Sequence, residues 1–112
     1  MAKYTMSICG DFESIIRRID SAVLEKSLSA SFEDAVKCCD GGYCSAMRVY
    51  ERYSFTGKNR VSMSVFIFGK DNRYNVTFIT SGGSQATFFK MNTLGEEAFL
   101  DTVIDAMSDI SD

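Results

Sequence analysis

The sequence contains no histidine, and histidine is the commonest general base of enzymes and the commonest neutral metal ligand. It also has no excess of positive charge, because its 112 residues carry a formal net charge of −3 at pH 7. A protein that binds nucleic-acid phosphates needs a positive field on its surface. We therefore expect no nucleic-acid partner.

Long apolar runs are missing as well. No stretch of the chain approaches the ~20 apolar residues that a membrane-spanning helix requires. Residues 1–8 do not contain the apolar run of a signal peptide either. We therefore expect no membrane association and a cytoplasmic location, where the four cysteines would be free thiols.

The cysteines lack the paired C-x-x-C spacing of a structural zinc site. Three of them, Cys38, Cys39 and Cys44, flank a predicted turn at 40–42, and a three-residue loop there would place Cys38 opposite Cys44. Cysteine in a strand usually serves as a small apolar residue. We expect no metal and no cofactor, and a redox role for these three cysteines stays open.

The patterns that are present predict a single domain over residues 1–112 with two amphipathic helices. Asp11 is a natural N-cap, and apolar residues at helical spacing follow it, which predicts a helix from Asp11 to about Glu25. A capping box at Thr93–Glu96 predicts a second helix that runs to about Ser108.

Alternating segments separated by glycine-rich and asparagine-rich turns predict an antiparallel sheet. A first strand is expected at Lys3–Cys9. Further strands are expected at 35–39, 43–55, 61–68, 74–80 and 86–91. The stretch 27–34 fits either an extended segment or a short helix, and we favour the extended form. The predicted fold class is α+β: a single antiparallel sheet in the order strand, helix, meander, helix, with both helices packed on one face.

Alternation along the strands separates an apolar face from a mixed one. The apolar face is expected to be the core, and it comprises Met47, Val49, Tyr53, Phe55, Val61, Met63, Val65, Ile67, Tyr74, Val76 and Phe78. The opposite face combines aromatic rings with arginines, at Arg48, Tyr50, Arg52, Phe66 and Phe68. Large exposed aromatic side chains are typical of an interface or a ligand groove.

These five residues indicate a non-catalytic module that binds or self-associates. The expected partner is a second copy of the chain, giving a dimer, or a small anionic or aromatic ligand held by guanidinium groups beside an aromatic ring. Arginines that only form salt bridges on a hydrated face are the competing explanation. The alternative function is a small enzyme that uses Glu51 with Arg48 or Arg52 as an acid–base or electrostatic pair, although a bulge or a position at the rim of the sheet would also explain Glu51.

Three segments are similar to a known family: residues 48–54 (RVYERYS), 80–86 (TSGGSQA) and 95–100 (GEEAFL). The chain resembles, over nearly its whole length, a family of short stand-alone bacterial proteins of unknown function. The resemblance implies a bacterial, cytosolic origin. It transfers no activity, ligand or catalytic residue to this sequence.

Overall fold

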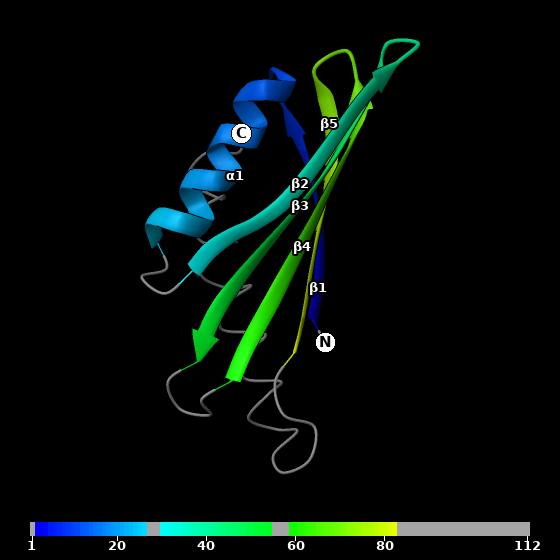
Figure 1. Ribbon diagram of the computed structural model, residues 1–112. Coiled ribbons are helices and arrows are strands. Elements are labelled where there is room, and N and C mark those ends of the chain that lie inside the picture. Colours follow the sequence, from blue (N-terminus) through cyan, green and yellow to red (C-terminus); the bar gives the residue numbers. More distant parts are fainter. Residues whose placement is uncertain (1, 27–29, 55–58, 83–112) are drawn as a thin grey trace.

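The computed structural model describes residues 2–26, 30–54 and 59–82, which form one helix and five strands. In chain order these elements are β1 (Ala2–Cys9), α1 (Phe12–Lys26), β2 (Ala30–Asp40), β3 (Tyr43–Ser54), β4 (Asn59–Lys70) and β5 (Arg73–Gly82). The strands make a single antiparallel sheet in the order β1-β5-β4-β3-β2. The strands before and after α1 are therefore the two edges, and α1 covers one face between them (Figure 1).

The first helix is confirmed, and its start follows from the sequence. The carboxylate of Asp11 accepts a hydrogen bond of 3.1 Å from the backbone amide of Ser14, as an N-cap does. The apolar stripe of the helix faces the sheet, and its members are buried: Phe12, Ile15, Ile16, Ile19 and Val23. Helix α1 is thus held mainly by this amphipathic face.

Two hairpins join β2 to β3 and β4 to β5, and the backbone dihedral angles of their turns are those that two-residue turns require. Gly41 and Gly42 have φ angles of 60° and 86°, and Asp71 and Asn72 have φ angles of 54° and 61°. Positive φ at both central positions is the mark of a type I′ turn, whose twist matches that of the strands. These turns fix the registers of β2 with β3 and of β4 with β5.

The predicted α+β arrangement with two helices packed on one face is wrong for the described residues, which form a five-stranded sheet with one helix. The second helix expected from Thr93 and the strand expected at 86–91 lie outside the described residues. Strand β2 is longer than predicted, because β3 offers it backbone partners from Tyr43 out to Arg52. Among the described residues, no helix combines the length and hydrophobicity needed to cross a membrane.

The predicted division of the sheet into two faces is correct on β4 and β5 and wrong on β3. The expected core residues of β4 and β5 are all buried: Val61, Met63, Val65, Ile67, Tyr74, Val76 and Phe78. On β3 the buried residues are Ala46 and Tyr50, whereas Met47 and Tyr53 are exposed and Val49 is half-buried on their side of the sheet. The register explains the difference, because Met47 lies opposite Phe66 and directly opposed residues share a face. Phe55 lies outside the described residues.

Candidate functional site

The five predicted site residues do not share a face. Phe66 and Phe68 lie on the face of the sheet that α1 leaves open, as predicted. Arg48, Tyr50 and Arg52 lie on the other face, because they pair in register with Val65, Met63 and Val61. The combined aromatic and guanidinium surface expected from the sequence is therefore divided between two sides of the sheet.

The open face carries a group of apolar side chains that crosses three neighbouring strands. We call it the open-face patch, and it consists of Val36, Tyr43, Met47, Phe66 and Phe68. Each member is between 43% and 66% exposed. Val36, Met47 and Phe66 form one row across β2, β3 and β4, since each lies opposite the next.

The rings of the open-face patch stack on one another. Tyr43 and Phe68 are nearly parallel, with ring centroids 5.5 Å apart, and Phe66 and Phe68 are also nearly parallel at 6.3 Å. The ammonium group of Lys70 lies 4.7 Å from the centroid of the Tyr43 ring, within the range of a cation–π contact. The patch is thus an ordered aromatic surface with a positive charge at one end.

On the helix side, Arg48 is bound by Asp20 of α1. Its guanidinium donates hydrogen bonds of 2.8 and 2.9 Å from Nη2 to the two carboxylate oxygens, and one of 3.1 Å from Nε. The hydroxyl of Tyr50 donates to the same carboxylate and accepts a 3.0 Å hydrogen bond from Arg48 Nε. The centroid of the Phe32 ring lies 4.7 Å from the guanidinium carbon. These contacts occupy Arg48, so it is not a free anion-binding group.

This arrangement raises two pKa values. Burial raises the pKa of Tyr50 above its ordinary value of 10, and the hydrogen bond to Asp20 adds to the effect. Burial alone would lower the pKa of Arg48, but the hydrogen bonds with Tyr50 and Asp20 outweigh it and raise the pKa. Both groups therefore keep their protons at neutral pH, and the cluster holds α1 on the sheet rather than exchanging protons.

Tyr50 should make the protein sensitive to alkali. Because its pKa is higher in the folded protein than in the unfolded chain, its contribution to stability is complete below pH 10 and falls as the pH rises above 10. The loss should reach about 1.4 kcal/mol per pH unit. Urea unfolding at pH 8 and pH 11 should show that the free energy of unfolding falls less between the two pH values for Tyr50→Phe than for the wild type. The exposed control Tyr43→Phe should keep the wild-type loss, and an equal loss in all three proteins would contradict the assignment.

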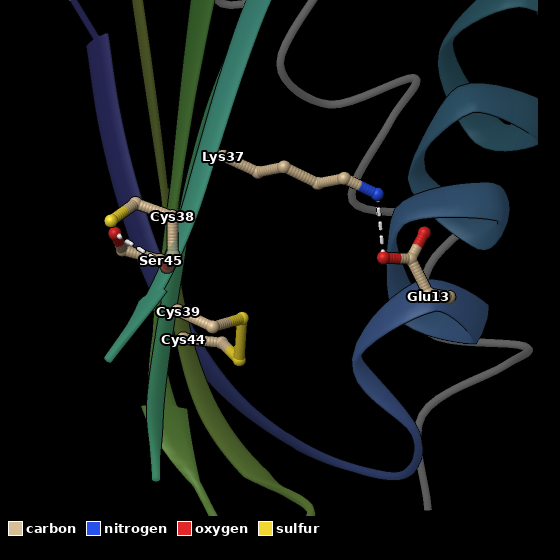
Figure 2. The surroundings of a disulfide bond; sticks show 6 residues. All are labelled: Glu13, Lys37, Cys38, Cys39, Cys44 and Ser45. Carbon is tan, nitrogen blue, oxygen red and sulfur yellow. Dashed lines mark hydrogen bonds and ion pairs between the residues drawn. A yellow bond between two sulfur atoms is a disulfide. The ribbon is translucent and has the colours of Figure 1, made fainter. Parts of the chain in front are cut away.

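A groove of about 310 Å³ lies between α1 and the β2 edge of the sheet. Its charged lining consists of two ion pairs, Glu13 with Lys37 and Asp20 with Arg48. In Figure 2, Lys37 extends from β2 to Glu13 on α1, and the two groups are 2.6 Å apart. Each charge in the lining has a partner, so the groove offers no unbalanced charge to a ligand.

The alternative pairing of Glu51 with Arg48 or Arg52 is not formed. Glu51 lies on the open face, where its carboxylate accepts a 2.8 Å hydrogen bond from Arg60. This position also removes the need for a bulge at Glu51. Within the described segments, no three acidic or cysteine side chains are grouped so as to hold a metal ion.

The prediction of four free thiols is wrong in this structure, because Cys39 and Cys44 form a disulfide. The three-residue loop that would have placed Cys38 opposite Cys44 is not formed either, since the turn has two residues and Cys38 lies opposite Ser45. Figure 2 shows the disulfide on the side of the sheet that faces α1, with Cys38 on the other side. Cys9 and Cys38 are free and exposed.

Comparison with protein families and with curated proteins gives one positive result. No curated protein matches the sequence. A family match covers residues 1–111, so the resemblance expected from the three sequence segments is confirmed. The chain belongs to the Family of unknown function (DUF6054).

Proposed function

We propose that the protein is a non-catalytic module that self-associates through the open-face patch. The observation that carries this proposal is the position of five large, exposed apolar side chains on three adjacent strands. Single exposed apolar residues are normal on protein surfaces, but contiguous apolar patches usually mark an interaction site. The groove beside α1 is a weaker candidate for the interaction site, because its charges are already paired within the chain.

The size of the open face supports a second copy as the partner. Strands of 8 to 12 residues at ~3.3 Å per residue, spaced ~4.8 Å apart, give a face of roughly 700 Å². A stable interface buries about 800 Å² on each partner. Two such faces can pack ~10 Å apart, as the sheets of a sandwich do.

Charges at the end of the patch also support self-association. Asp40, Tyr43 and Lys70 form one row across β2, β3 and β4, so an acid and a base flank the ring of Tyr43. A two-fold axis brings the same surface of both copies together. The acid of one copy can then face the base of the other, which makes the row self-complementary.

Phe66→Glu should convert the dimer to a folded monomer. Phe66 is about half exposed, so covering the rest of its ring is worth ~1 kcal/mol, and burying a glutamate in its place costs at least ~1 kcal/mol more; a two-fold interface counts both twice. The dissociation constant should therefore rise on the order of several hundred-fold. Sedimentation velocity of the full chain at several concentrations measures the change, and circular dichroism measures the fold.

The matched control is Thr5→Glu, which places the same charge on the edge strand β1, two strands away from Phe66 and at the rim of the open face. It should weaken association much less than Phe66→Glu. A wild-type protein that stays monomeric at every concentration would contradict self-association. If native mass spectrometry detected a small aromatic molecule bound to a monomer, the partner of the patch would be a ligand and not a second copy of the chain. Unfolding of Phe66→Glu would show that the ring is covered within the chain.

A further inference from the structure

The disulfide joins β2 and β3 beside their hairpin turn. Cys39 lies directly opposite Cys44 in the register, and the Gly41–Gly42 turn is between them. The bond lies on the same side of the sheet as Lys37 and faces α1, as Figure 2 shows. It is therefore placed at the end of the edge strand that lines the groove.

The cross-link contributes little to the global stability of the fold. The two cysteines are only five positions apart, and a disulfide stabilises mainly by restricting the loop that it closes in the unfolded chain, so a short loop gains least. The two-residue turn and the backbone ladder already fix the register of β2 on β3. A bond with a small structural contribution is free to serve a chemical role.

The two cysteines differ in how exposed they are. Cys39 is exposed on the edge strand, whereas Cys44 is half-buried and packs against the hydrophobic core. Thiol–disulfide exchange begins with attack by a thiolate on one sulfur atom, and access selects which one. An incoming thiolate should therefore attack Cys39 and release Cys44.

We propose that Cys39–Cys44 is a reversible redox site that exchanges with external thiols, a class that includes small thiol compounds and protein cysteines. A thiolate attacks Sγ of Cys39, a mixed disulfide forms there, and Cys44 leaves as a thiolate that takes up a proton. A second thiolate attacks the external sulfur of the mixed disulfide and releases Cys39 as a thiolate. Two external thiols are thereby oxidised to one disulfide, and the protein disulfide is reduced to two thiols.

Reduction should loosen the turn end of β2. This strand is an edge strand, so its backbone ladder has one neighbour, and it is exposed along nearly its whole length. Without the disulfide, the hairpin end is held to the sheet by that ladder, while Lys37 still contacts Glu13. The groove between α1 and β2 would then have one movable wall.

The test uses the full chain equilibrated with buffers of reduced and oxidised glutathione, followed by acid quenching, alkylation and peptide mass analysis. The disulfide should convert completely from oxidised to reduced across the buffer series, while circular dichroism shows that the protein stays folded. In Cys44→Ser, glutathione should be trapped on Cys39, whereas in Cys39→Ser it should reach Cys44 at least tenfold more slowly. Hydrogen exchange at residues 36–40 should rise at least tenfold on reduction, with β5 unchanged.

Cys38→Ser is the matched control, because Cys38 is a neighbouring exposed thiol outside the disulfide. It should keep the wild-type titration. A disulfide that stays intact in excess reduced glutathione while the protein is folded would overturn the proposal. So would equal trapping at Cys39 and Cys44, or a reduced protein that does not re-form the bond in oxidised glutathione. If either single variant unfolds, the proposal is judged from the disulfide titration and the hydrogen exchange of the wild-type protein.

Discussion

Ile67→Asp is expected to unfold the protein. Ile67 is fully buried on β4, and its cross-strand neighbours Ala46 and Val76 are apolar and buried as well. A carboxylate there would have no partner on these neighbours, and burying it would cost several kcal/mol. The lost packing of isoleucine adds about 2–5 kcal/mol. The sum is comparable to the whole stability of a domain this size, which is about 5–15 kcal/mol.

The control for Ile67→Asp is Ser64→Asp on the same strand. Ser64 lies on the open face, so in the monomer the new charge stays in contact with water, and the cost to the fold of the monomer should be about 1 kcal/mol or less. Urea unfolding followed by circular dichroism compares the two variants. If Ile67→Asp unfolded cooperatively near the wild-type midpoint, α1 would not cover this face of the sheet.

Local signals in the sequence were sufficient for α1 and for the positions of the hairpin turns, although not for the length of the turn at 41–42. Asp11 and the apolar stripe behind it define a helix without reference to the rest of the chain. Asp71-Asn72 and Gly41-Gly42 adopt positive φ at both turn positions, and few residue types do so easily. Such features are predictable because their cause lies within a few residues of the element itself.

The orientation of β3 was not predictable in the same way. One set of its alternate residues includes Met47 and Tyr53, and the other includes Arg48 and Tyr50. Hydrophobicity favoured burial of the first set, but the structure buries the second. The deciding partner is Asp20, which is far away in sequence and becomes visible only when α1 is placed on the sheet.

The disulfide shows how a single residue of loop length changes a predicted contact. A loop of three residues at 40–42 pairs Cys38 with Cys44, whereas the observed turn of two residues pairs Cys39 with Cys44. Side chains alternate between faces along a strand, so the same step moves Cys38 to the opposite side of the sheet. The open-face patch was affected less, because Phe66 and Phe68 lie on a strand whose alternation is clear.

The second large effect is expected at Asp20, whose carboxylate serves both Arg48 and Tyr50. Asp20→Ala would leave the side chain of Arg48, only 15% exposed, without its acidic partner. Removing one member of a fully buried ion pair costs about 3–5 kcal/mol. Because the side chain of Asp20 is 33% exposed and water can reach it, we expect a loss of ~2–3 kcal/mol.

Two further variants separate this buried cluster from an ordinary surface ion pair. Glu13→Ala breaks the other pair between α1 and the sheet, whose side chains are more than half exposed, and should cost less than about 1 kcal/mol. The double variant Asp20→Ala/Arg48→Met removes the unpaired charge and should be more stable than Asp20→Ala alone. Urea unfolding at pH 7 ranks the four proteins. Equal losses for Asp20→Ala and Glu13→Ala would contradict a special role for the Asp20 cluster, as would a double variant less stable than Asp20→Ala.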